Sequence, residues 1–162
     1  MALPDSEWSF TAAFHFSVSI NDKPVSFCEV SGIECTLDVD PVVSGGDSSH
    51  SYYVPKSRKY SDLVLKRGVV KGDDDFFVWC KEILSTELTK GGIKPKNLLV
   101  SLLNEGGEEL VTWSFTNAYP VKWSLGAFNA DKSEVALETV TLKYYSFDVQ
   151  KKVPKKNESA NK

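Results

Sequence analysis

The stretch that decides the fold reads WSFTNAYPVKW over residues 113–123 and, after a polar break, SEVALETVTLKYYSFDV over residues 133–149. Apolar and polar side chains alternate through both parts, a pattern typical of half-buried β-strands. Pro120 cannot donate to a β-ladder, so we expect it at a strand start, an edge or a bulge. The stretch therefore predicts a sheet whose aromatic face is buried in its own domain, against a neighbouring copy, or both, and we expect Trp113, Phe115 and Trp123 to contribute to the core of the domain.

Length and composition indicate one ordinary globular domain. The 162 residues are 41% hydrophobic and 25% charged, so neither a disordered nor a membrane-spanning chain is indicated. We expect one domain over residues 1–149 and a flexible basic tail over residues 150–162. The tail holds five lysines and one glutamate, or +4, which leaves −7 of the net charge of −3 on the domain. An acidic domain with a short basic tail is not the pattern of a nucleic-acid-binding fold.

Cysteine usage and the first residues favour cytoplasmic folding. Cys28, Cys35 and Cys80 form no CxxC pair, and we expect three reduced, buried thiols. Residues 1–10 contain neither Lys nor Arg and no long apolar run. We therefore expect no secretory signal peptide.

Residues 10–40 carry three strand patterns. Residues 10–20 are apolar at every even position, which leaves His15 on the polar face as an exposed or lumen-side residue rather than a ligand. A second strand covers residues 25–30, and Gly32 then marks a bulge or bend before the period resumes. In this third strand the polar face carries Glu34, Thr36, Asp38 and Asp40.

The alternation stops over about residues 40–60, which are rich in Gly, Ser and Pro. A connection of this length is unusual in a compact domain. Two interpretations remain open: a surface loop, or an extended hairpin that orders on a partner. The adjacent Tyr52 and Tyr53 are amphipathic side chains of the kind that interfaces favour.

A helical period follows a run of three aspartates. Apolar side chains recur at helical spacing over about residues 73–90. Asp73, Asp74 and Asp75 suit the N-terminus of that helix better than a metal site, and Gly91-Gly92 suits its end. With about seven strands and no βαβ rhythm, the chain is predicted to be mainly β, an antiparallel sandwich or barrel with one flanking helix.

No motif predicts catalysis. The two histidines, His15 and His50, lack the spacing of a zinc site, and no GxSxG nucleophile motif is present. Gly45-Gly46 lacks the GK[ST] ending of a phosphate-binding loop. We therefore expect no catalytic residues, no metal and no cofactor.

Several short segments keep a fixed order between about residues 8 and 149. They are FHFSVSI (14–20), FCEVSGI (27–33), the Gly45-Gly46 loop ending near Val54-Pro55, Tyr60 through LKRG (65–68), FVW (77–79), NEG (104–106), WSFTNAYPVKW (113–123) and ETVTL (138–142). Together they resemble the tail-tube protein family of contractile phage tails and contractile injection systems. The EVSG, LKRG and NAYPVKW segments are the most specific.

The resemblance implies six copies in a ring, with rings stacked into a hollow tube inside a contractile sheath. In that family the sheets of neighbouring subunits join edge to edge, which would remove the liability of an open sheet edge. It implies contacts between subunits and stacked rings by the long loop, with the candidate residues Val43, Gly45, Gly46, Tyr52, Tyr53, Val54 and Tyr60. It also implies a wet lumen, for which the candidates are Glu34, Thr36, Asp38 and Asp40.

The implied partners are further copies of the chain, a sheath protein, baseplate and tube-cap proteins, and an effector or DNA passing through the lumen. No stable membrane association is expected, and assembly would precede a final place in a phage-like particle, extracellular or cell-anchored. Two alternatives remain: the hexameric tube of type VI secretion, and a monomeric β-barrel that binds a small ligand.

Overall fold

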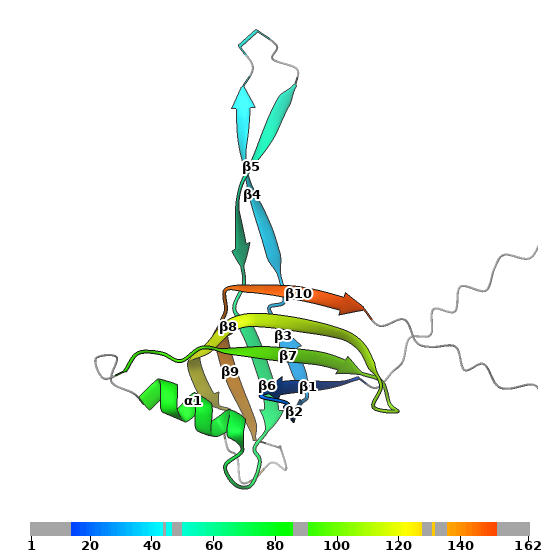
Figure 1. Ribbon diagram of the computed structural model, residues 1–162, viewed down its shortest axis with the longest axis vertical. Helices are drawn as coiled ribbons and strands as arrows, with labels where there is room; N and C mark the ends of the chain where they lie inside the picture. Colours follow the sequence, from blue (N-terminus) through cyan, green and yellow to red (C-terminus); the bar gives the residue numbers. More distant parts are fainter. Residues whose placement is uncertain are drawn as a thin grey trace, which may run out of the picture.

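The computed structural model describes residues 14–43, 45–46, 50–85, 91–127, 131 and 136–151, which form ten strands and one helix (Figure 1). The elements are β1 His15–Ile20, β2 Lys23–Phe27, β3 Glu29–Ser31, β4 Cys35–Val43, β5 Ser51–Tyr60, β6 Leu63–Gly68, α1 Asp75–Ser85, β7 Lys96–Leu103, β8 Glu109–Leu125, β9 Leu137–Lys143 and β10 Ser146–Lys151. The mainly β prediction with one helix is confirmed. Three more strands are present than the seven expected, because two expected strands are each interrupted and β5 forms within the expected loop.

Antiparallel pairing closes most of these strands into a barrel. The order in the eight-stranded sheet is β2-β1-β7-β8-β9-β6-β3, and β10 also pairs with β8. The two ends of this order, β2 and β3, are consecutive in the chain and meet at Cys28, whose N–H donates to the carbonyl oxygen of Lys66 on β6 over 2.9 Å. One bent segment therefore pairs with β1 on one side and β6 on the other, which closes the sheet.

The stretch from 113 to 149 supplies the bend of the barrel. The first half of β8 pairs with β7 and β10, and its second half pairs with β9. The switch between these two sets of partner strands occurs at Asn117, which has a positive φ of 52°. Its N–H donates to Asn97 Oδ1 at 3.0 Å. The register shifts between Pro120 and Lys122, which confirms a bulge as the place for Pro120. Bulges of this kind bend a strand and re-aim its side chains.

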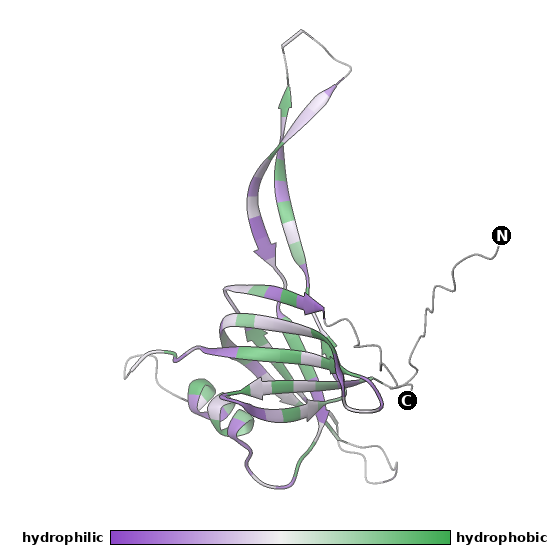
Figure 2. Ribbon diagram, turned by 45° about the vertical axis from the view of Figure 1, so that its right-hand side comes forward, coloured by the Kyte–Doolittle hydropathy of each residue, from purple (hydrophilic) through white to green (hydrophobic). Residues whose placement is uncertain are grey.

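Apolar side chains from both halves of the barrel form one core in its interior. Figure 2 shows hydrophilic and hydrophobic residues alternating along the strands that supply them. The fully buried residues include Val18 of β1, Leu65 of β6, Leu98 of β7, Phe115 of β8 and Leu142 of β9. Trp113 packs against this core, as expected. Trp123, which was also expected to contribute to the core, is 38% exposed instead, because the bulge after Pro120 precedes it and it lies against α1.

Helix α1 packs its buried face, Phe76, Trp79 and Cys80, against the barrel. Asp74 caps it: the N–H of Phe77 donates to Asp74 Oδ1 at 2.7 Å, as the sequence predicts for an aspartate before a helix. The observed start is two residues later than the expected 73, and the expected end over residues 86–90 lies outside the described residues.

Strands β4 and β5 form a separate two-stranded hairpin that projects from one end of the barrel (Figure 1). Of the two interpretations of residues 40–60, the structure bears out the hairpin itself, which begins earlier, at Cys35. Its ordering on a partner stays a prediction. Its nine paired positions extend roughly 30 Å at about 3.4 Å per residue. At its base Gly32 has a φ of +82°, and a Cβ there would lie 1.8 Å from the carbonyl oxygen of Asp62. Only glycine fits here, because the backbone at residue 32 passes very close to the backbone at residue 62.

Near the C-terminus of the chain, β10 continues to Lys151, so Gln150 and Lys151 of the expected tail pair with Thr112 and Val111. The domain boundary expected at 149 thus lies inside a strand. Residues 152–162 lie outside the described part of the chain.

Candidate assembly surface

The hairpin has two faces, which its register defines. Pairing runs from Cys35 opposite Tyr60 to Val43 opposite Ser51, and Lys56 is the extra residue of a bulge beside Asp38 and Val39. Because side chains alternate across a strand, one face is apolar apart from Arg58 and Ser51, and the other is polar near the base. The apolar face of the hairpin comprises Cys35, Leu37, Val39, Pro41 and Val43 of β4 with Ser51, Tyr53, Pro55, Arg58 and Tyr60 of β5.

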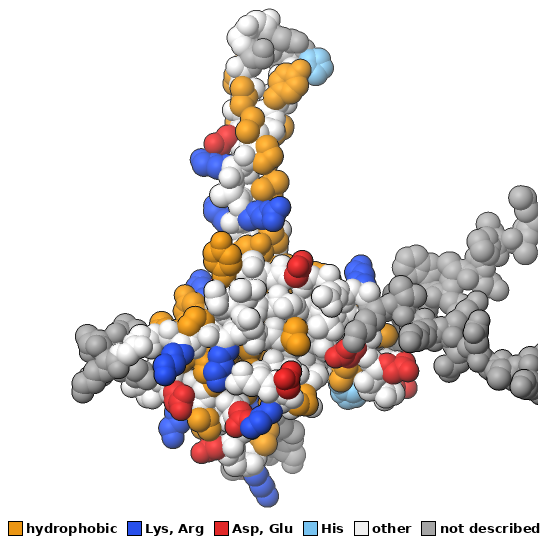
Figure 3. Space-filling model, viewed as in Figure 1, with side chains coloured by type: hydrophobic (Ala, Val, Ile, Leu, Met, Phe, Trp, Pro, Cys, Tyr) orange, Lys and Arg blue, Asp and Glu red, His pale blue; other side chains and the backbone are white. Residues whose placement is uncertain are grey.

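This apolar face is exposed to solvent in the single chain, and Figure 3 shows hydrophobic side chains along the hairpin. Leu37 is 50% exposed and Val39 is 45% exposed. The sequence pattern of β4 resembles that of a strand with one face in a core, but no second layer among the described residues covers it. Contiguous exposed apolar surface of this kind marks sites of protein association.

The candidate stacking residues fall into three places. Val43, Tyr52, Tyr53 and Val54 lie on the outer half of the hairpin, where Tyr52 and Tyr53 are 68% and 65% exposed. Gly45 and Gly46 lie in the exposed turn beyond β4. Tyr60 lies apart from them, at the base, where its ring contacts Tyr144 and Phe147 at centroid distances of 5.8 and 5.5 Å.

The candidate lumen residues lie together near the base of the hairpin. Thr36, Asp38 and Asp40 alternate along β4 on the polar face, and Glu34 precedes them. Glu34 accepts hydrogen bonds from Thr36 Oγ1 at 3.5 Å and Ser61 Oγ at 3.1 Å. The face is less acidic than its sequence indicates, because β5 places two lysines beside the aspartates. Lys59 lies 2.5 Å from Asp38, and Lys56 lies 3.2 Å from Asp40.

An aromatic cluster joins the hairpin to the barrel. Tyr144 contacts Phe115 at a centroid distance of 4.8 Å and also contacts Tyr60 and Phe147. The Tyr144 hydroxyl is buried without a hydrogen-bond partner among the described residues. Its burial, with the nearby Cys35 and Tyr60, raises the pKa of Tyr144 to about 12. The cluster packs the base of the hairpin against the barrel, beside the hydrogen bonds that Ser61 donates to Glu34.

A buried polar network around Arg67 fixes α1 on the barrel, and the sequence pattern did not predict it. Arg67 of β6 is 4% exposed; its Nε donates to Glu138 Oε2 at 2.7 Å, and its Nη1 pairs with Asp74 at the helix start. Glu138 also accepts from the indole Nε1 of Trp123 at 2.5 Å. The network therefore joins residues of the LKRG, ETVTL and NAYPVKW segments with the cap of α1.

The ionisation of this network follows from its contacts. Burial opposes the charged form of Asp74, but the hydrogen bonds from Arg67 and from the Phe77 N–H outweigh it and lower the pKa of Asp74. For Arg67, burial likewise opposes the charge, and the bonds to Asp74 and Glu138 raise its pKa. Both groups are thus charged at neutral pH, and their charges stabilise each other.

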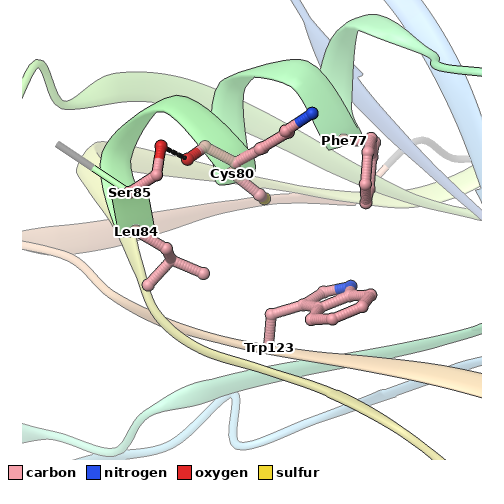
Figure 4. Close-up of a pocket in the computed structure, with 6 residues that line it drawn as sticks. Phe77, Cys80, Leu84, Ser85 and Trp123 are labelled. Carbon is pink, nitrogen blue, oxygen red and sulfur yellow. Dashed lines mark hydrogen bonds between the residues drawn. The ribbon is translucent and has the colours of Figure 1, made fainter.

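A groove lies between α1 and the second half of β8, and it too has no sequence signal. Phe77, Cys80 and Leu84 point from α1 towards Trp123 across a cavity of about 310 Å³ (Figure 4). An adjoining cavity of about 300 Å³ shares Phe77 and Trp123 and is lined further by Val69, Val70, Asp73 and Leu125. The α1 groove is defined as Val69, Val70, Asp73, Phe77, Leu84 and Trp123.

The described residues hold no group of three or more His, Cys, Asp or Glu side chains arranged for a metal ion. Burial raises the pKa of the Cys80 thiol to about 12. Cys28 and Cys35 are exposed, which corrects the expectation of three buried thiols. Cys28 lies at the junction of β2 and β3, and Cys35 is the first residue of β4 in the hairpin. At both places one side of the chain faces solvent. No helix in the described part of the chain is long and apolar enough to cross a membrane.

The structure thus combines a closed barrel with a projecting hairpin whose apolar face is exposed and with a separate apolar groove beside α1. The family model of the T4-like virus tail tube protein gp19 matches residues 12–148. The chain belongs to this tail tube protein family. The resemblance inferred from the EVSG, LKRG and NAYPVKW segments is thereby confirmed.

Solved structures agree with the family. A chain in the anti-feeding prophage tube-terminating cap is 25% identical, with a TM-score of 0.72 over 94% of this chain and 95% of that one. A chain in the sheath-tube complex of an extracellular contractile injection system, PVC, is 28% identical, with a TM-score of 0.70 over 84% of this chain and 88% of that one.

A more distant likeness concerns the fold alone. Hcp1 from Flavobacterium johnsoniae is 15% identical, with a TM-score of 0.54 over 85% of this chain and 96% of that one. No curated protein sequence matches the chain.

Proposed function

We propose that this protein is the inner-tube subunit of a contractile injection system or phage-like tail, in which rings of six copies stack into a hollow tube. The observation that carries the proposal is the family match over residues 12–148, combined with a hairpin whose apolar face is exposed in the single chain. The similarity to chains of a tube-terminating cap and a sheath-tube complex supports sheath and cap proteins as further partners, and we propose a baseplate protein as a third.

The function is mechanical rather than catalytic. A closed barrel with a filled interior resists deformation, because packed cores have low compressibility. The Arg67 network fixes α1 to that barrel, and the exposed hairpin supplies contacts to other copies. A tube of such subunits transmits the force of sheath contraction to a target envelope while an effector or DNA passes through its lumen. No enzymatic step is part of this proposal.

We assign the polar face of the hairpin, with Glu34, Thr36, Asp38 and Asp40, to the lumen. The opposite face is apolar and suits contact with protein, which leaves the polar face for water. The ion pairs of Asp38 with Lys59 and Asp40 with Lys56 reduce its net negative charge. A nearly balanced wall repels polyanions less than an unpaired acidic ring would, and it also holds fewer of them than a basic one.

Two other functions are less well supported. A type VI secretion tube shares the fold, but the similarity to Hcp1 is 15% identity. A monomeric ligand-binding barrel needs interior space, and here Val18, Leu65, Leu98, Phe115 and Leu142 fill the interior with 0% exposure each.

Electron microscopy and sedimentation of the purified protein test the proposal. At high protein concentration we expect rings and tubes with a central channel, and six-fold class averages viewed down the axis. Particles of one-chain mass at every concentration would contradict it. A central channel closed by side chains would contradict the transport role while leaving the structural one.

A further inference from the structure

The hairpin and the α1 groove lie at opposite ends of the molecule. In Figure 1, which has the longest axis vertical, the hairpin projects from one end of the barrel, and α1 lies towards the other. An apolar projection at one end and an apolar groove at the other allow copies to join head to tail. Such heterologous contacts repeat without closing on themselves along an axis, which is the geometry that a stack requires.

The two surfaces also agree in length and chemistry. From Arg58 to Tyr53 the apolar face of the hairpin extends roughly 17 Å at about 3.4 Å per residue. From Asp75, at the start of α1, to Leu84 the helix extends roughly 14 Å at about 1.5 Å per residue, and Asp73 lies just before that start. Leu37, Val39 and Tyr53 are exposed on the first surface, and Val69, Val70 and Trp123 are exposed on the second.

Each surface carries a charge that no ion pair joins to another described residue: Arg58 on the hairpin face, and Asp73 in the groove, whose lining also includes Lys81 further along α1. Arg58 is the one charged side chain among the described residues of the hairpin's apolar face, and the neighbouring pairs use Lys56 and Lys59 instead. Asp73 lines the groove and forms no ion pair with another described residue. The two aspartates that follow it are paired, Asp74 with Arg67 and Asp75 with Lys23. A charge covered by apolar contact is costly unless it meets an opposite charge.

From this complementarity we infer that the α1 groove receives the apolar face of the hairpin of the next copy, with Arg58 paired to Asp73 across the contact. This inference rests on the proposed tube and names the surface that receives the hairpin. The pairing fixes the register of the contact, because either charge placed elsewhere along the groove would be covered without a partner. It leaves the polar face of the hairpin free.

A charge exchange tests the pairing. R58E places a carboxylate opposite Asp73, and D73R places a guanidinium opposite Arg58, so we expect each single variant to raise the critical concentration for tube formation at least ~10-fold. The double variant R58E/D73R restores an opposite pair with the charges exchanged, and we expect its critical concentration within about threefold of the wild type. Sedimentation and negative-stain microscopy measure it.

The matched control is K59E, which reverses a charge one residue away on the polar face, beside Asp38. We expect K59E to form tubes at wild-type concentrations, and circular dichroism should give the same fold for all four variants. Single variants that assemble like the wild type would overturn the inference, and so would a double variant as defective as the singles. A wild-type protein that forms no rings or tubes would instead contradict the proposed function.

Discussion

At the scale of single residues, Arg67 stabilises the position of α1. It is buried against the rings of Phe27 and Phe76 at 5.4 and 5.5 Å, and it bonds to both Glu138 and Asp74. We expect Arg67→Ala to lower the free energy of unfolding by about 3–5 kcal/mol, because it removes the cation from the buried Glu138 carboxyl and leaves that group only the hydrogen bond from Trp123. Lys66→Ala removes an exposed pair with Glu29 and should cost under about 1 kcal/mol. Chemical denaturation of both variants measures this, and equal losses would contradict the buried role.

Asp74 gives the same network a pH dependence. Its pKa is lowered in the folded protein, so the unfolded chain binds the proton more readily. Its contribution to stability is therefore complete above the unfolded pKa of about 3.9 and is lost as the pH falls through the lower folded value. We expect Asp74→Asn to be less stable at pH 7 and to lose less stability on acidification. A wild-type slope in the variant, in unfolding titrations from pH 7 to pH 2, would refute the assignment.

Gly32 is required by a close backbone crossing. A Cβ would meet the Asp62 carbonyl, and the φ of +82° alone costs an alanine about 1–2 kcal/mol. The matched position is Gly107, which has a φ of +80° and where an added Cβ would have no described atom within 4 Å. We expect Gly107→Ala to lose only the backbone cost and Gly32→Ala to lose clearly more, by thermal and denaturant unfolding. Equal losses of stability in the two variants would contradict this prediction, because they would show that the backbone shifts at residues 32 and 62 to accommodate the Cβ.

At the scale of elements, the hairpin contributes to assembly more than to folding. Tyr52 and Tyr53 lie on its exposed outer half, while Tyr60 belongs to the aromatic cluster at its base. We expect the double substitution of Tyr52 and Tyr53 by Ala to change the free energy of unfolding of the isolated subunit by less than about 1 kcal/mol and to weaken tube formation. Tyr60→Ala should destabilise the subunit itself by about 2–4 kcal/mol. An equal loss of subunit stability in both would contradict this division.

At the scale of the whole molecule, assembly should protect the surfaces that the single chain exposes. The barrel strands β7, β8 and β9 each carry fully buried residues, whereas β4 and β5 pair only with each other. In hydrogen exchange by mass spectrometry, we expect the hairpin to exchange quickly in the free subunit and slowly in the tube, with little change in β7 and β9. A hairpin that exchanges equally fast in both states would exclude it from the contacts between copies.

The sequence alone determined the class of fold, the main strands, the capped helix and the family. These follow from local signals: alternation gives a strand, the Asp run gives a helix start, and Gly32 and Pro120 mark a bend and a bulge. The alternation of apolar and polar residues also placed Asp38 and Asp40 on one face of a strand. The register of β4 and β5 confirms this placement.

Only the tertiary structure decided what covers each face. Periodicity shows that Leu37 and Val39 share an apolar face, but it cannot show that this face is left exposed on a hairpin. Arg67 and Glu138 are 71 residues apart, and their contact exists only because β6 pairs with β9. The α1 groove, likewise, needs a helix and a bent strand in contact. The physical reason is that burial and ion pairing depend on neighbours in space, which a one-dimensional pattern does not specify.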